Sequence, residues 1–356
     1  MQFLDLPLQR PQILQTELPA LSMTAVTDSA LAVEELLQEN YLVIEDFYPV
    51  GLRLLAALKK RIKTQFPTAD FQQERAFRNA YHKASRKVLL EIQNNKIRVK
   101  KAPKIGWLDI LYPDISDFVL TFPDVQGLNS AWQWYTKGIY IPVLKKKLHP
   151  FYNCYFPTRF EHLELFNRYL QSYKGKKDTA YDIGTGSGAL IHILLNQGFK
   201  KIYATDNNPN AIAGIRNDIQ HKRLPENLDL QYGDLFANFT EPADLIAFNP
   251  PWLPANQAIQ DLDTAVYYPE NLLPRFFRQA QTRLTHSGKI MVLFSNLAQI
   301  TDLSKNNPVE DALKEFPELY TEDFKTQKVQ PGSEKTRRNL SHRRQEHVEL
   351  WVIGKK

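Results

Sequence analysis

The sequence of 356 residues has a single cysteine, Cys154, and no long apolar run. One thiol cannot form a disulfide within the chain, and no Cys/His spacing suits zinc, so we expect no disulfide and no metal site. The longest apolar runs, at 41–44 and 289–294, fall far short of the roughly 20 residues of a membrane helix. The N-terminus MQFLDLPLQRPQ lacks the basic start and apolar run of a signal peptide. We therefore expect a cytoplasmic protein without a membrane span.

What is present is a globular composition, with 43% hydrophobic and 24% charged residues. At roughly 100 to 200 residues per domain, this length predicts two domains. Prolines at 103, 113, 123, 142, 150 and 157 indicate a connecting region, so we place the boundary near 150. The prediction is an N-terminal substrate-recognition domain at 1–150 and a second domain at 151–356.

Positive charge is concentrated in two stretches of the chain. Residues 82–104 hold eight Lys/Arg against one Glu, and residues 325–356 hold nine Lys/Arg against three Glu. These stretches sum to +13 (7 + 6), so the other 301 residues sum to −7 within the net charge of +6. Clustered cations on one surface are typical of a protein that binds a polyanion, although solvated basic faces remain an alternative.

The first domain reads as mixed α and β. Helical spacing covers 30–38 and 51–66, and 41–47 is strand-like. KVLLEIQ and KIRVKKA flank Asn94-Asn95, which predicts a hairpin because Asn tolerates the positive φ of a two-residue turn. The first basic stretch would then lie partly on this hairpin.

The second domain alternates regularly between strand and helix. This alternation predicts a doubly wound, mostly parallel α/β sheet with ligands at the carboxyl ends of its strands. The tail predicts a terminal antiparallel pair, 322–330 and 346–356. The other expected strands are 179–184, 201–206, 228–234, 243–248 and 289–295, and the expected helices are 159–173, 188–198, 209–220 and 271–284.

A glycine-rich turn joins the first strand and helix of this series as Asp182-Ile-Gly184-Thr-Gly186-Ser-Gly188-Ala189. Its glycines allow a tight turn and a close backbone approach to a ligand. The turn also satisfies the dinucleotide pattern G-x-G-x-x-A, which leaves an NAD enzyme open. Asp182 places negative charge where a pyrophosphate would lie, and it favours a cofactor with cationic groups.

Acidic and amide side chains follow the next strands. Asp206 ends the second strand, where its carboxylate could accept both hydroxyls of a ribose, and Asp234 follows the third, where it could accept an amino proton of adenine. Singly, each would more often be a cap or turn residue. After the fourth strand comes Asn249-Pro250-Pro251-Trp252. The prolines remove two donors, so the carbonyls and the Asn249 amide oxygen could hold a planar amino group, and Trp252 could stack on it.

In this order and spacing, DIGTGSG, ATDNNP, GDLF and FNPPW resemble the class I S-adenosylmethionine-dependent methyltransferases. They are most similar to the N-methyltransferases with an Asn-Pro-Pro-aromatic motif, the HemK-like glutamine methyltransferases and the ribosomal RNA amino-N-methyltransferases. Trp252 stands where those groups more often carry Tyr or Phe. The resemblance implies a Rossmann-like seven-stranded sheet with its last strand antiparallel. It also implies S-adenosyl-L-methionine bound by Phe156, Thr158, Arg159, Asp182, Gly184, Thr185, Gly186, Gly188, Asp206, Asn207, Asp234 and Leu235, with Asn249, Pro250, Pro251 and Trp252 as the catalytic motif.

We therefore expect a methyltransferase that acts on an exocyclic amino group of a nucleic acid, and we favour RNA over DNA as the substrate. The alternatives are N5-methylation of a glutamine in a translation factor or ribosomal protein, and a non-catalytic nucleic-acid-binding subunit. If 322–330 is a strand parallel to the first five, the loop after it leaves the sheet at the active-site edge. The cations expected to bind the substrate are Lys96, Arg98, Lys100, Lys101, Lys335, Arg337, Arg338, Arg343 and Arg344.

Overall fold

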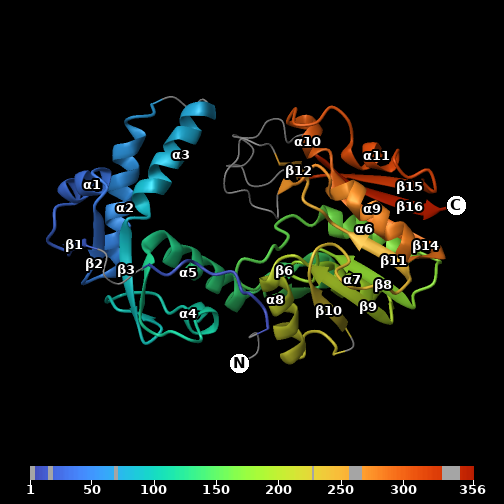
Figure 1. Cartoon of the computed structure of the whole chain (residues 1–356), viewed down its shortest axis with the longest axis horizontal. Helices are drawn as coiled ribbons and strands as arrows, with labels where there is room; N and C mark the ends of the chain where they lie inside the picture. The colour runs from blue at the N-terminus through green and yellow to red at the C-terminus, as the bar shows by residue number, and fades with distance from the viewer. Residues whose placement is uncertain (1–4, 15–18, 68–70, 227, 256–266, 331–344) are drawn as a thin grey trace. The chain divides into compact units, whose positions relative to one another are not determined.

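The computed structural model describes residues 5–14, 19–67, 71–226, 228–255, 267–330 and 345–356 (Figure 1). The chain divides into two compact units. The first holds residues 1–4 and 8–137, and the second holds 5–7 and 138–356. The division thus falls between Lys137 and Gly138, whereas the sequence analysis places it near residue 150. No helix in the described ranges is both long and apolar enough to cross a lipid bilayer.

The first unit is built on a five-stranded sheet in the order β1-β2-β3-β4, with β5 also paired to β3. β1, β2 and β3 are parallel, whereas β4 and β5 run antiparallel to β3. The strands are β1 (Ala20–Met23), β2 (Tyr41–Ile44), β3 (Val88–Gln93), β4 (Lys96–Ile97) and β5 (Phe118–Thr121). The helices are α1 (Ser29–Leu37), α2 (Tyr48–Lys63), α3 (Phe71–Ser85), α4 (Trp107–Leu111) and α5 (Phe122–Lys137).

The expected hairpin is confirmed in β3 and β4, although its second strand ends at Ile97 and does not extend to Ala102. Asn94 and Asn95 have φ of 51° and 55°. Two successive left-handed residues form the turn whose twist matches that of antiparallel strands.

The expectation of a connecting region from 103 to 158 is wrong. This stretch contains β5 and the 16-residue helix α5. Pro123 is the second residue of α5, where a missing N–H leaves no helical hydrogen bond unmade. Proline therefore marks the start of an element here.

The second unit contains a seven-stranded sheet in the order β10-β9-β8-β11-β14-β16-β15. Every neighbouring pair is parallel except the two that involve β16. The predicted doubly wound fold is confirmed, including the antiparallel last strand. The strands are β8 (Thr179–Ile183), β9 (Lys201–Asp206), β10 (Leu228–Tyr232), β11 (Ala243–Phe248), β14 (Leu284–Ser295), β15 (Leu319–Lys328) and β16 (His347–Lys355).

Helices cover both faces of this sheet. Successive residues of one strand belong to different apolar clusters, because side chains alternate across a strand. Leu245 of β11 packs in the cluster under α6 and α7, and Ile246 in the cluster under α9 and α11. The helices of this unit are α6 (Glu161–Ser172), α7 (Ala189–Asn196), α8 (Pro209–Gln220), α9 (Leu272–Arg283), α10 (Leu297–Ile300) and α11 (Pro308–Leu313). Shorter pieces are β6 (Ile139–Ile141), β7 (Lys146–Leu148), β12 (Leu253–Pro254), β13 (Tyr267–Tyr268) and a 3-10 turn at Pro142–Leu144.

Candidate active site

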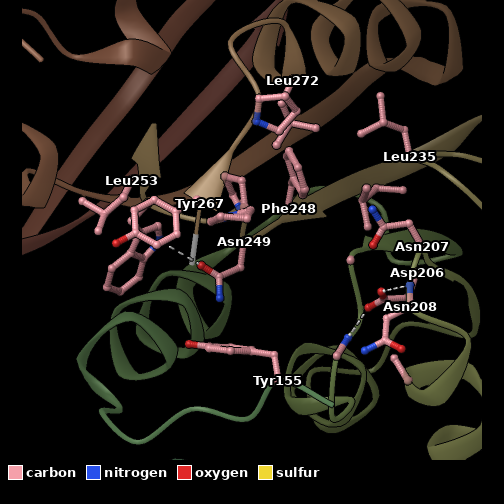
Figure 2. A pocket seen from close by; sticks show the side chains of 18 of the residues that line it. Tyr155, Asp206, Asn207, Asn208, Leu235, Phe248, Asn249, Leu253, Tyr267 and Leu272 are labelled. Carbon is pink, nitrogen blue, oxygen red and sulfur yellow. Dashed lines mark hydrogen bonds between the residues drawn. The ribbon is translucent and has the colours of Figure 1, made fainter. Parts of the chain in front are cut away.

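A cavity of about 500 Å³ lies at the carboxyl ends of β8, β9 and β11 (Figure 2). This size falls within the range of small-molecule sites in proteins. Among the residues that the structure describes, all of those that line it belong to the second unit. Gly184, Asp206 and Asn249, which end or follow these strands, all line it, as expected from the sheet topology.

The glycine loop after β8 has its glycines in the left-handed region of backbone conformation, which favours glycine. Gly184, Gly186 and Gly188 have φ of 68°, 51° and 76°. A Cβ on Gly186 would lie 3.1 Å from the carbonyl oxygen of Tyr155. The loop therefore presents bare backbone to the cavity at Gly184 and Gly186, which suits close contact with a ligand.

Asp206 lies at the end of β9 with both carboxylate oxygens held by backbone donors. Oδ2 accepts the N–H of Gly186 and Oδ1 accepts that of Asn208, both at 2.8 Å. Burial raises the pKa of this carboxyl group. Each oxygen retains acceptor capacity, so the fixed carboxylate fits the two hydroxyls of a ribose.

Asp182 lies below the glycine loop and is absent from the cavity lining. It is fully buried, and its Oδ2 accepts a hydrogen bond from Thr185 Oγ1 at 2.8 Å. Burial raises its pKa to about 7, and the charge of Asp206 adds to the shift. The Asp182 carboxyl thus stabilises the glycine loop through its hydrogen bond with Thr185. Three other expected cofactor residues, Phe156, Thr185 and Gly188, also lie outside the lining, whereas Thr158, Arg159, Asn207 and Leu235 belong to it.

Asp234, which follows β10 next to the end of β9, has a protein partner. The guanidinium of Arg275, on α9, donates to its Oδ2. Both residues line the cavity next to the buried side chain of Leu235. The carboxylate expected to accept an adenine amino proton is thus shared with Arg275, which is 41 residues away in sequence and carries no local signal.

The Asn-Pro-Pro-Trp segment follows β11, and all four of its residues line the cavity. The indole Nε1–H of Trp252 donates to Asn249 Oδ1 at 3.2 Å. Trp252 packs against the apolar clusters on both faces of the sheet. Tyr267, which pairs with Leu253 through β12 and β13, adds a second aromatic ring to this side of the cavity (Figure 2).

His162, on the first turn of α6, is a cavity residue that the sequence analysis does not identify. Its ring lies 5.5 Å from that of Trp252 at an interplanar angle of 89°. The side chain is 1% exposed, and within the described ranges neither ring nitrogen has a hydrogen-bond partner. Burial lowers its pKa to about 4, so the imidazole is neutral at physiological pH.

Arg159 and Glu346 form a second contact that sequence alone does not indicate. Arg159 donates to the almost fully buried Glu346 at 3.0 Å, and both line the cavity. Glu346 directly precedes β16. The segment before α6 is thereby tied to the last strand of the sheet.

The expected substrate cations divide into two sets. Lys96, Lys100 and Lys101 are exposed in the first unit, and the Nζ atoms of Lys100 and Lys101 lie 5.8 and 5.6 Å from the ring centre of Phe47. Arg98 is ion-paired to Glu91. The second set, Lys335, Arg337, Arg338, Arg343 and Arg344, lies outside the described residues.

The flanks of the second set confirm the topological expectation. β15 runs antiparallel to β16, which runs antiparallel to β14, so β15 is parallel to the first five strands. The N–H of Val329, just after β15, donates to the carbonyl of Glu346 at 3.0 Å. The segment between them therefore begins and ends at the edge of the sheet that holds the cavity.

Comparison with known proteins identifies the family. Residues 164–322 match the model of the methyltransferase small domain. A protein from Methanocaldococcus jannaschii assigned as an N5-glutamine methyltransferase is 30% identical over 166 residues, 45% of this chain and 80% of that protein. The tRNA1(Val) (adenine(37)-N6)-methyltransferase of Cytophaga hutchinsonii is 25% identical over 48% of this chain and 74% of its own length. Among solved structures, the ribosomal protein L11 methylase of Lactobacillus delbrueckii gives a TM-score of 0.37 at 18% identity, over 55% of this chain and 77% of that one.

S-adenosylmethionine is the cofactor of this family, and the bare glycine loop and the fixed Asp206 carboxylate fit it. Both similar enzymes are named for transfer to nitrogen. The chain therefore belongs to the S-adenosylmethionine-dependent N-methyltransferases.

Proposed function

We propose that the protein methylates an exocyclic amino group of a nucleic acid base, in RNA rather than DNA. The observation that carries this proposal is the wall beside Asn249, formed by Trp252, Leu253 and Tyr267. Aromatic rings bind nucleobases by stacking, at roughly 1 to 3 kcal/mol per base. A planar base between such rings would bring its amino group to the Asn249 oxygen.

In this reaction the protein mainly positions the acceptor. S-adenosylmethionine supplies a methyl group that is already activated for in-line displacement. Asn249 Oδ1 would accept one N–H of the target amino group and direct the nitrogen lone pair along the line of attack. Pro250 and Pro251 add no N–H donor that could compete for that nitrogen. The proton released after transfer can leave to water, so the proposal assigns no base among the cavity residues.

Two basic sets support a polyanionic substrate. Lys96, Lys100 and Lys101 are exposed in the first unit, and the 331–344 segment carries five cations and starts at the cavity edge of the sheet. Lys and Arg bind phosphates through charge and counterion release. We propose that both sets hold the substrate backbone and that the first unit is the recognition domain.

A second candidate is N5-methylation of a protein glutamine. It is favoured by the similarity to the protein from M. jannaschii, of which this chain covers 80%. A glutamine carboxamide is also planar and also presents two N–H groups, so Asn249 could hold it in the same way. The two candidates differ in what the cation sets would contact.

Labelling with radioactive S-adenosylmethionine separates the candidates. Cell lysate, protein-free RNA, DNA and RNA-free protein serve as acceptors, each followed by RNase, DNase or protease. We expect label in RNA that RNase releases, and severely reduced transfer by Asn249→Ala although calorimetry shows unchanged cofactor binding. Label that only protease releases would replace this proposal by the glutamine candidate, and wild-type turnover by Asn249→Ala would contradict the assignment of Asn249.

A further inference from the structure

We propose that Trp252 and His162 are positioning residues that fix the orientation of the Asn249 carboxamide. The inference rests on the proposed transfer to a nitrogen held by Asn249, and it holds for a base or a glutamine as acceptor. It is carried by three contacts, which are the Trp252–Asn249 hydrogen bond, the perpendicular Trp252–His162 pair and the packing of Trp252 between two apolar clusters.

The hydrogen bond determines which end of the carboxamide faces Trp252. An indole N–H is only a donor, so its partner 3.2 Å away must be the oxygen of Asn249 and not the nitrogen. The carboxamide is therefore held in one of its two flipped orientations before any acceptor arrives. Figure 2 shows this bond from the Asn249 oxygen, with the amide nitrogen directed away from it.

The orientation matters because the acceptor also presents N–H groups. The Asn249 oxygen has two lone pairs, and Trp252 uses one, which leaves the second for the target amino group. In the flipped orientation the Asn249 NH₂ group would face the target amino group, so that two hydrogen-bond donors would oppose each other. The Asn249 NH₂ group could also donate to the lone pair of the target nitrogen. Trp252 thus favours the one orientation in which the lone pair stays free for transfer.

The Trp252 ring is itself held on several sides. It contacts the clusters under α6 and α7 and under α9 and α11, and the His162 ring meets it at 89°. Perpendicular ring pairs at this separation are favourable beyond the apolar area they bury. Because neither nitrogen of His162 has a partner in the described part of the chain, the ring contact is what His162 contributes.

The first test needs no acceptor. The chain has five tryptophans, so its ¹⁵N–¹H spectrum holds five indole signals, and Trp252→Phe identifies one of them. We expect Asn249→Ala to shift this signal and to speed its hydrogen exchange at least tenfold, whereas Asn238→Ala at an exposed site leaves it in place. An unchanged signal in Asn249→Ala would overturn the proposal.

The second test is kinetic and uses whichever acceptor the wild type labels. Trp252→Phe keeps an aromatic ring but loses the donor, so we expect kcat to fall roughly fivefold to tenfold, the value of one hydrogen bond, with unchanged S-adenosylmethionine affinity. In the Asn249→Ala background the same change should have no further effect. His162→Ala should lower kcat in a similar way, and His162→Phe should recover most of that loss, because the ring contact is what matters. Replacement of the exposed His286 by Ala serves as the control.

The outcomes distinguish this inference from the proposed function. If Trp252→Phe keeps wild-type kcat, or if His162→Phe is as impaired as His162→Ala, the positioning role is wrong whatever the acceptor. If nucleic acid is not labelled but protein is, the choice of substrate fails, and the same variants test positioning on the protein acceptor.

Discussion

The His162 side chain places two polar nitrogens among buried atoms without a partner in the described ranges. A buried polar group without a hydrogen bond typically costs about 1 to 3 kcal/mol. His162→Phe keeps a planar ring and removes both nitrogens. The site therefore retains a polar residue at a place where an apolar one would stabilise the fold.

We expect the stability gained by His162→Phe to grow as pH falls. Burial lowers the folded-state pKa of His162 to about 4, below the roughly 6.5 of the unfolded chain. Between these values the unfolded state binds the proton and the folded state does not, so wild-type stability falls on acidification. The difference in unfolding free energy between variant and wild type should increase by about 2 kcal/mol from pH 7.5 to pH 5.

Urea unfolding at several pH values measures this difference. The contribution of Asp182 to the pH dependence of stability has the opposite sign. Its folded-state pKa is raised to about 7, so its protonation below that pH stabilises the fold. Both proteins keep Asp182, so its contribution cancels in the comparison. His286→Gln, at an exposed position, should follow the wild type. A difference that stays constant with pH would show that His162 is not held neutral.

For single residues, the sequence predicts the cavity residues at strand ends. It does not predict the cavity residues that come together only in the folded chain. Gly184, Asp206 and Asn249 are predictable because a parallel sheet brings the carboxyl ends of its strands together. Arg275 and His162 lie on helices with ordinary amphipathic spacing, and only tertiary packing brings them into the cavity. For the same reason the burial of Asp182 behind its loop is not apparent from the motif.

At the scale of elements, the loop between β15 and β16 carries the strongest prediction. It begins and ends at the carboxyl edge of the sheet. Replacing Arg337, Arg338, Arg343 and Arg344 together by Ala should weaken nucleic-acid binding and flatten its salt dependence, by up to about one unit of slope per lost phosphate contact. Cofactor binding should be unchanged, because the cavity contacts assigned to S-adenosylmethionine lie elsewhere.

A matched control removes four cations from the opposite edge. These residues precede β8 and β9, at the amino ends of the strands, and are Lys174, Lys176, Lys177 and Lys200. Their replacement by Ala changes the net charge equally and should leave the salt slope near that of the wild type. Equal slopes for both quadruple variants would assign the effect to total charge and not to the cavity edge. The measurement is fluorescence anisotropy of labelled RNA over a salt series.

Elements were predictable where hydrophobic periodicity is strong. Helix α8 occupies the expected 209–220, and the strands of the seven-stranded sheet begin and end within five residues of their predicted positions. Helix α5 was not predicted, because Pro123 reads as a break in a sequence that is rich in aromatics and prolines. In the structure this proline lies in the first helical turn, where no N–H is needed.

For the whole molecule, the division after Lys137 predicts a separable cofactor-binding part. Every lining residue in the described part of the chain lies in the second unit. A fragment of residues 138–356 should therefore bind S-adenosylmethionine within a few-fold of the full chain. It should bind the nucleic acid acceptor more weakly, because it keeps the cations of 331–344 but lacks Lys96, Lys100 and Lys101. It also loses the exposed Asp5–Arg216 ion pair, which contributes little to stability.

Calorimetry with S-adenosylmethionine and anisotropy with RNA check both halves of this prediction. Asp206→Ala in the fragment is the control, since loss of the ribose acceptor should abolish cofactor binding in either context. A fragment that binds RNA as tightly as the full chain would remove the recognition role proposed for the first unit.

The strand order also affects how the chain folds as it is synthesised. β16 pairs with both β14 and β15, although it follows both of them in the sequence. Until residues 347–355 leave the ribosome, β14 lacks its neighbour on one side and β15 has no partner in the sheet. Unpaired strand edges are where newly made chains associate wrongly. The growing polypeptide therefore passes through a stage at which the other six strands of this sheet have been translated, while Glu346, which precedes β16 and lines the cavity, is not yet held in place.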